Sequence, residues 1–216
     1  MGVRLPNGAI ISMAATYGAV SALSAFTNAN PAVATLAGGH SIVAGDVFEY
    51  VGGWSRISAQ ILRASALNVN DVTCEGLNTL NTNYFVPGSG LGNIREIATW
   101  QEIAQVLTTN SKGGDQQFVN YQFLADGQQR QLPSSKNPQS VDLTIADDIT
   151  LPHYPLLVDA DDDRQLRAIR VVLPGGQKLY YNAIVSLNKQ PTLTIDQVMA
   201  QTVVLSFQGP IARFAT

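Results

Sequence analysis

The strongest local candidate for chemistry is a run of glycines, Gly88-Ser89-Gly90-Leu91-Gly92. Glycines near this spacing can cradle the phosphates of a dinucleotide where a strand passes into the first turn of a helix. Here the pattern is G-x-G-x-G instead of G-x-G-x-x-G, Pro87 interrupts the approach, and no βαβ alternation surrounds the run. We therefore interpret it as a flexible linker that leads into a helix cap.

The second candidate is the acidic segment Asp159-Ala160-Asp161-Asp162-Asp163, whose carboxylates are spaced as in a calcium loop. An EF-hand also needs a glycine next and a bidentate glutamate at its twelfth position, and Arg164 and Arg170 stand there. Two interpretations stay open. The segment is either a solvated acidic loop partly neutralised by nearby arginines, or a surface that repels another polyanion.

No other grouping predicts a reaction. His40 and His153 each lack a cysteine or acidic partner at ligand spacing, which argues against a metal site. The sequence has no G-x-S-x-G elbow for a serine nucleophile. Asp147-Asp148, and Glu96 with Glu102, are explained more simply by strand ends and a helix surface. We expect no catalytic residue, no cofactor and no metal.

The two tryptophans suggest binding through stacking. Trp54 and neighbouring tyrosines could form a platform for a sugar, whereas Trp100 belongs to an apolar face and is assigned to the core. The function that these residues suggest is a carbohydrate- or receptor-binding β-sandwich module.

Composition favours contacts between copies. The chain has 216 residues and is 45% hydrophobic, but only 13% of its residues are charged. That is about half the usual charged share, so we expect much of the surface to be covered by other copies. The net charge of −3 argues against neutralising nucleic-acid phosphates. The lone Cys74 excludes an internal disulfide, and no apolar run is long enough to span a bilayer.

The elements that would position these residues are mostly strands. Residues 1–21 are small and apolar, suited to an N-terminal arm, and residues 22–80 hold short strands broken by turns, typical of a small barrel-like or sandwich module. Residues 77–92 are a linker. Alternating apolar residues predict further strands at 141–145, 167–173 and 179–187.

One helix is predicted, at 94–107. Asn93 and Glu96 resemble a capping box, and apolar residues from Ile94 to Leu107 recur at spacings of three and four. A strand at 116–124 follows, and then a long polar loop at 126–140, of the kind that a partner orders.

Several segments resemble the major tail tube protein of long-tailed, siphovirus-type bacteriophages, and together they cover nearly the whole chain in order. They are LPNGAIISMAATYGAV (5–20), FTNANPAVATLAGGHSIVAGDVFEYVGGWSRI (26–57), LGNIREIATWQEIAQVL (91–107), GGDQQFVNYQFLADGQQRQLPSSKNPQS (113–140), ADDITLPHYPLL (146–157) and LPGGQKLYYNAIVSLNKQPTLTIDQVMAQTVVLSF (173–207). The region 22–80 departs from compact family members and is interpreted as an added β module.

The resemblance implies a mainly β fold, two packed antiparallel β-sheets with one flanking helix, in which residues 81–216 form the tail-tube core. It also implies a structural, non-enzymatic virion protein that is assembled in the host cytoplasm. Six copies would close a ring, and stacked rings would form a tube that passes double-stranded DNA without binding it specifically. The implied partners are further copies, the tape-measure protein, the tail terminator and baseplate proteins, with no membrane. Our candidates for acids that face the bore are Asp159, Asp161, Asp162 and Asp163.

Overall fold

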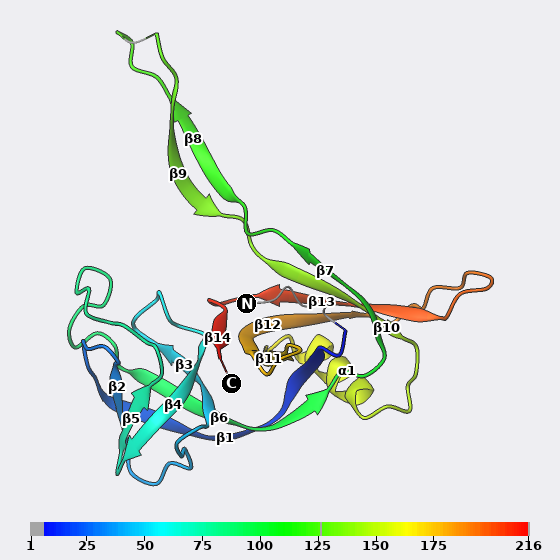
Figure 1. Ribbon diagram of the computed structural model, residues 1–216, viewed down its shortest axis with the longest axis horizontal. Helices are drawn as coiled ribbons and strands as arrows, with labels where there is room; N and C mark the ends of the chain where they lie inside the picture. Colours follow the sequence, from blue (N-terminus) through cyan, green and yellow to red (C-terminus); the bar gives the residue numbers. More distant parts are fainter. Residues whose placement is uncertain (1–6, 126, 216) are drawn as a thin grey trace.

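The computed structural model describes residues 7–125 and 127–215, which form an antiparallel β protein with one helix (Figure 1). The predicted fold class is confirmed. The elements in chain order are β1 Ile10–Phe26, β2 Val33–Leu36, β3 Val47–Gly52, β4 Gln60–Asn68, β5 Asp71–Cys74, β6 Gly92–Glu102, β7 Val106–Lys112, β8 Gln116–Tyr121, β9 Arg130–Lys136, β10 Ser140–Ala146, α1 His153–Asp163, β11 Leu166–Val172, β12 Lys178–Asn188, β13 Ala200–Phe207 and β14 Ala212–Phe214.

Six strands close on themselves into a small barrel. The pairings run β1–β2–β5–β4–β3–β6 and return from β6 to β1, so each of these strands has two neighbours. A closed sheet has no open edge. The interior is filled by an apolar cluster with Trp54 near its middle, and that ring lies 4.9 Å from Phe26 and 5.2 Å from Phe85. The barrel therefore carries its own core.

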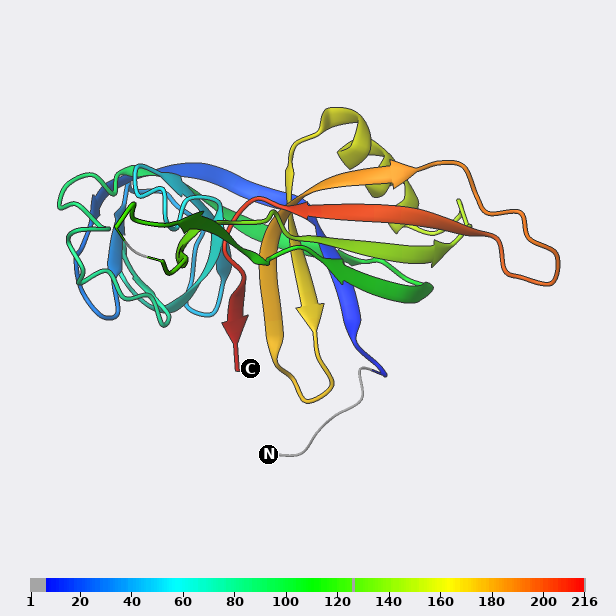
Figure 2. The ribbon, with the colours of Figure 1, turned by 90° about the horizontal axis from the view of Figure 1, so that it is seen from above.

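The remaining strands extend from the two long barrel strands, β1 and β6, and form a second, curled sheet. The first part of β1 leaves the barrel and pairs with β11, and the sheet continues through β12, β13 and β10 to β7. Figure 2 shows β1 and β6 running through both bodies. Irregular register between Ala14 and Val20 bends β1 where it crosses. Helix α1 packs Leu157 and Ala160 into the core of this sheet.

The helix predicted at 94–107 is wrong, because this stretch forms β6 and β7. The spacing of three between Ile94 and Ile97 does not mark one helical face, since the two side chains enter different apolar clusters. Gln105 takes a positive φ of 57°, which no α-helix accommodates. Pairing with β1 and β3 supplies the stabilisation that overrides the local pattern.

The helix that does form lies in the segment expected to be an irregular acidic loop. Pro155 stands in its first turn. Proline has no amide hydrogen, but the first amides of a helix have no acceptor within the helix, so no hydrogen bond is lost there. The helix ends at Arg164, which is left-handed with φ 54° and whose amide donates to the Ala160 carbonyl. Prolines at the start and the spacing of Leu157 and Ala160 were the signals that would have revealed it.

The segment predicted to be an N-terminal arm is strand β1 from Ile10 onward, while residues 1–6 lie outside the described residues. The loop predicted at 126–140 is wrong in part, because residues 130–136 form β9 and pair with β8; residue 126 lies outside the described part. The strands of this hairpin are almost entirely exposed, so their sequence lacks the alternation of apolar and polar residues that predicts a strand.

Candidate functional site

The glycine run belongs to the barrel and does not precede a helix. The Tyr50 hydroxyl donates to the Gly90 carbonyl at 2.9 Å, and a Cβ at Gly90 would collide with the ring of Trp54. Gly92 begins strand β6. The glycines therefore allow the chain to pass close to the buried tryptophan, and this packing explains the pattern without a nucleotide.

The histidines and carboxylates do not converge on a catalytic or metal centre. His153 is buried, its Nδ1 accepts the Ala104 amide at 3.4 Å, and burial lowers its pKa. Glu96 accepts a hydrogen bond from the Ser41 hydroxyl. Asp147 accepts one from the side-chain amide of Gln201, and Asp148 accepts one from the Thr150 hydroxyl. Among residues 7–125 and 127–215, no three acidic, histidine or cysteine side chains are grouped to hold a metal ion.

The acidic segment forms the C-terminal end of α1, where most of its carboxylates have partners. Asp161 accepts the Leu187 amide at 3.1 Å, and Lys189 lies 3.0 Å from Asp162 and 3.8 Å from Asp161. Asp163 pairs with Arg167. Asp159 is exposed. A helix does not present these carboxylates as a calcium loop does, so the EF-hand comparison fails on geometry as well as on sequence.

The tryptophans do not form a surface for sugar binding. Trp54 is only 2% exposed, and its indole nitrogen donates to the Val86 carbonyl at 2.9 Å. Trp100 is partly buried, with the Arg170 guanidinium 4.8 Å from its ring. The platform proposed at Trp54 is therefore wrong, because the barrel closes around the ring.

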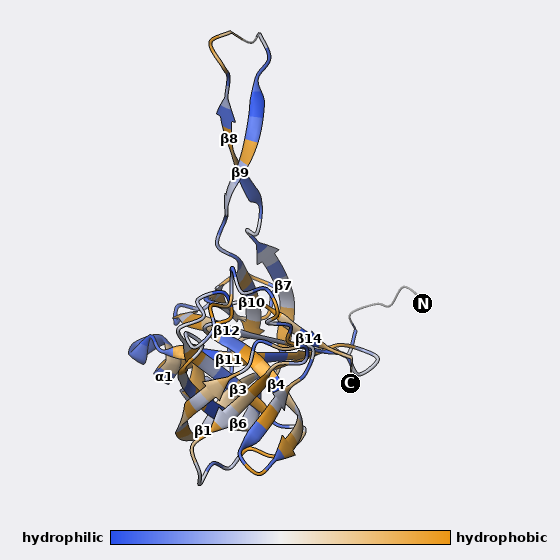
Figure 3. Cartoon of the chain, turned by 90° about the vertical axis from the view of Figure 1, so that its left-hand side faces the viewer, coloured by the Kyte–Doolittle hydropathy of each residue, from blue (hydrophilic) through white to orange (hydrophobic). Residues whose placement is uncertain are grey.

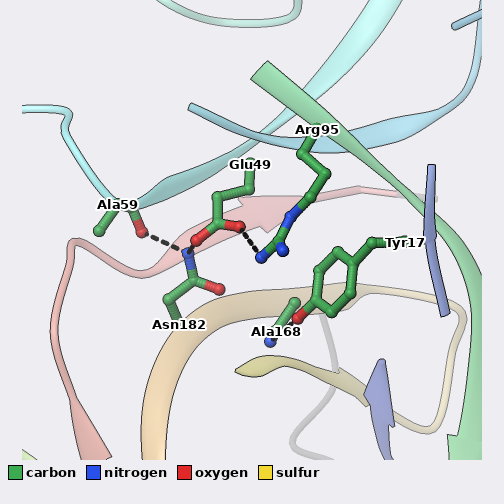
Figure 4. A network of polar contacts seen from close by, with 6 residues as sticks. All are labelled: Tyr17, Glu49, Ala59, Arg95, Ala168 and Asn182. Carbon is green, nitrogen blue, oxygen red and sulfur yellow. Dashed lines mark hydrogen bonds and ion pairs between the residues drawn. The ribbon is translucent and has the colours of Figure 1, made fainter. Parts of the chain in front are cut away.

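A polar network joins the barrel to the curled sheet (Figure 4). Glu49 on β3 is 4% exposed and accepts from Arg95 at 2.7 Å and from Asn182 at 2.8 Å. The Arg95 guanidinium lies 3.8 Å from the centre of the Tyr17 ring, and the Tyr17 hydroxyl accepts the Ala168 amide at 2.9 Å. Burial raises the pKa of Tyr17. Sequence reasoning missed this network because its members come from five strands that are far apart in the chain.

Strands β8 and β9 form a hairpin that extends away from both bodies (Figures 1 and 3). Figure 3 shows apolar residues on this projection. The exposed large apolar side chains are Phe118, Val119, Phe123, Leu124 and Leu132. A two-stranded ribbon is marginal in water on its own. The hairpin is therefore the most plainly unpartnered element among the described residues.

A second apolar projection is the loop 189–199 between β12 and β13 (Figure 2). Its backbone is closed at the base, where the Thr192 amide donates to the Ala200 carbonyl at 2.9 Å. Leu193, Ile195 and Val198 point into solvent beyond that closure. Two exposed apolar projections on a weakly charged chain are features of a surface that binds another protein.

The described residues contain no helix that is long and apolar enough to cross a membrane.

Comparison with known proteins gives one strong match. The family described as "Phage tail tube protein, TTP" matches residues 52–216. No curated protein sequence matches the chain.

Solved structures give only distant likenesses. A chain of the "Virion of native gene transfer agent (GTA) particle" has a TM-score of 0.43 at 12% identity, covering 54% of this chain and 89% of that one. A chain of the "Tail of empty GTA particle computed with helical refinement, C6 symmetry" has a TM-score of 0.44 at 12% identity, covering 55% and 88%. One from the "Cryo-EM structure of the anti-feeding prophage (AFP) baseplate, 6-fold symmetrised" has a TM-score of 0.41 at 14% identity, covering 55% and 85%. Likenesses this distant establish neither fold nor function.

Proposed function

This chain belongs to the phage tail tube protein family, and from that membership we propose that six copies close into a ring and that rings stack into a hollow tube. The chain is a structural subunit of a virion tail. Double-stranded DNA passes through the tube without specific binding. The tube encloses a tape-measure protein and ends at terminator and baseplate proteins, and the subunits assemble in the host cytoplasm. No catalytic step is part of this role.

Two open sheet edges support ring closure. Strand β7 pairs with β10 on one side, and the described residues offer nothing on its other side. Strand β6 pairs with β3 only from Gly92 to Glu96, which leaves its segment 97–102 bonded to β1 alone. Unpaired edges are aggregation sites unless another strand covers them. Two different edges on one chain suit a head-to-tail contact that closes into a ring.

The edge of β7 is built for a specific contact. Its residues from Thr108 to Ser111 are small, polar and uncharged, and they are exposed. Lys112 pairs with Asp142 on the neighbouring strand at 2.5 Å, which places charge at only one end of the edge. An edge with little charge does not repel an identical copy. This exposed, hydrogen-bonding edge is the observation that carries the proposal, together with the family match.

We propose that the chain divides into a part that forms the tube wall and a separate barrel. Residues 81–216 form the tube wall with the first part of β1, and the module 22–80 is a separate barrel carried by the same two long strands. We retain Asp159, Asp161, Asp162 and Asp163 as candidates for the bore. Fixed negative charge there would keep DNA from adhering to the wall. Asp159 contributes most, because Lys189 and Arg167 partly neutralise the other three.

Electron microscopy of the purified full chain tests the proposal. We expect negative-stain images with six-fold rings or stacked tubes, and averaged images that place α1 toward the bore. A chain that stays monomeric at high concentration would contradict ring formation. Rings with α1 on their outer surface would contradict only the assignment of the four acidic residues.

A further inference from the structure

The contact between the barrel and the curled sheet is tight at one end of β12. Side chains alternate along a strand, so Tyr180 and Asn182 share the face of β12 that meets the barrel. Tyr180 is 3% exposed and belongs to an apolar cluster that also holds Ile61 of the barrel. The Asn182 side-chain amide is fully buried and donates to Glu49 and to the Ala59 carbonyl, both in the barrel. These contacts hold the two bodies together.

The contact is open at the other end. A groove of about 350 Å³ lies there between the two bodies. Leu166 lines it from β11 and pairs with Ile184, two residues beyond Asn182 on β12. Val20 of β1 and Val51 of β3 line it from the barrel, and their side chains are 63% and 50% exposed. We call these two residues the groove valines. The interface is therefore a wedge with uncovered apolar surface at its wide end.

The polar network beside this groove lacks one hydrogen bond (Figure 4). The Asn182 Oδ1 atom is buried, and no donor among the described residues reaches it. Leaving a buried acceptor without a donor destabilises the fold. Arg95 is close by, because Glu49 accepts from Arg95 with one carboxylate oxygen and from Asn182 with the other. A guanidinium has five N–H groups, so Arg95 can serve a second acceptor.

Strand β1 is irregular next to the groove. Its pairing with β6 changes register three times between Ala14 and Val20. Irregular pairing of this kind bends a strand. The bend lies between residues 10–13, which pair with β11 of the curled sheet, and residues 23–26, which pair with β2 of the barrel. A hinge at this place lets the barrel tilt without breaking the pairing of either body.

We propose that the barrel rocks on the apolar contact at Tyr180 and closes the groove, with the bend in β1 as the hinge. In the closed position Arg95 still binds Glu49 and also donates to Asn182 Oδ1. Leu166 then covers the groove valines, which removes their apolar surface from water. The inference goes beyond the proposed tube function, because it concerns a single chain and holds whether or not copies assemble.

The charges at the groove do not oppose closure. Arg95 and Arg167 both line it, and they approach each other when it narrows. Each of them has its own carboxylate, Glu49 for Arg95 and Asp163 for Arg167. Closure therefore brings together two ion pairs and no unpaired positive charges.

Disulfide formation across the groove tests the closed position. In dilute, dissociated protein we expect Val51→Cys with Gln165→Cys to form an intramolecular disulfide, which requires Cα atoms within about 7 Å of each other. Both residues are exposed and line the groove, one from the barrel and one from the start of β11. Burial raises the pKa of the native Cys74 thiol to about 12, so this thiol contributes little at neutral pH.

Arg95→Lys in the same double-cysteine chain shows whether the proposed hydrogen bond drives closure. Lysine keeps a positive charge beside Glu49 but lacks the planar fork of the guanidinium. We expect the disulfide to form about tenfold more slowly, as for the loss of one charge-assisted hydrogen bond. The matched control is Arg56→Lys, whose arginine lies over Tyr84 on the barrel and does not line the groove. Equal rates in Arg95→Lys and the control would overturn the proposal.

Spin-label distances measure the same motion without a new bond. Val69 in the barrel and Ile149 after β10 are exposed positions, one on each body, and each takes a label as a cysteine variant. We expect two distance populations in the dissociated chain, and Arg95→Lys should deplete one of them with an unchanged circular dichroism spectrum. One distance, the same in both proteins, would overturn the proposal by showing a rigid junction. Because no assembly takes place in these measurements, their outcome leaves the tube function untouched.

Discussion

The barrel and the β8–β9 hairpin are both antiparallel β-structure, but they solve the problem of unpaired backbone in opposite ways. Each barrel strand has a neighbour on both sides, and the interior holds Phe26, Tyr50, Trp54 and Phe85 in ring contact. In the hairpin each strand has one neighbour, and both of its faces meet solvent. The barrel is complete within one chain, whereas the hairpin needs a second one.

The difference shows where stability and assembly are encoded. Removing apolar surface from water stabilises a protein by about 25 cal/mol per Å². The barrel buries its apolar surface when the chain folds, whereas the hairpin can bury its apolar surface only when it binds another copy. Substitutions in the barrel should therefore change the free energy of unfolding of the dissociated chain, and those in the hairpin should change assembly alone.

The largest effect is expected at the centre of the barrel. Trp54→Ala removes a buried ring and leaves the Val86 carbonyl without its donor, so we expect a loss of about 3–5 kcal/mol in the free energy of unfolding. Urea denaturation of dilute, dissociated protein measures it. A loss under about 1 kcal/mol would mean that the barrel is not a packed core.

A smaller loss is expected where the barrel meets the curled sheet. Arg95→Ala leaves the buried Glu49 carboxylate without its cationic partner and exposes the Tyr17 ring, which should cost about 2 kcal/mol. Arg56→Ala is the matched control, because it removes an arginine that lies over the exposed ring of Tyr84. Equal losses in both variants, measured by the same urea titration, would show that burial of Glu49 does not matter.

Alkaline pH should weaken the barrel through Cys74. Its pKa is raised by burial from 9.0 to about 12, so above pH 9 the unfolded chain loses this proton before the folded chain does. Stability then falls as pH rises, by about 1–2 kcal/mol at pH 10 relative to pH 8. Cys74→Ala should lack this part of the fall. Identical pH profiles of the melting temperature for the two proteins would contradict it.

The smallest effect on stability is expected in the hairpin. Phe118 is half exposed, so Phe118→Ala should change the free energy of unfolding of the dissociated chain by less than about 0.5 kcal/mol. Chemical denaturation at low concentration measures this. A loss comparable to that of Trp54→Ala would contradict the contrast between barrel and hairpin, because the hairpin would then be part of a core within one chain.

The sequence by itself determined those parts of the fold that depend on near neighbours. Alternating apolar residues correctly placed the strands at 141–145, 167–173 and 179–187, which are β10, β11 and β12. The resemblance spread along the chain was enough to indicate the family, which the match over residues 52–216 confirms. These inferences need no knowledge of distant pairing.

Only the tertiary structure decided what β6 is, where Trp54 lies and which segments project. Residues 94–102 have a helical spacing, but they become a strand because β1 and β3 flank them, and these partners are distant in sequence. Trp54 is buried because six strands close around it. Glu49, Arg95 and Asn182 meet for the same reason. Local patterns report which side of an element is apolar, whereas pairing between remote strands decides what that side will face.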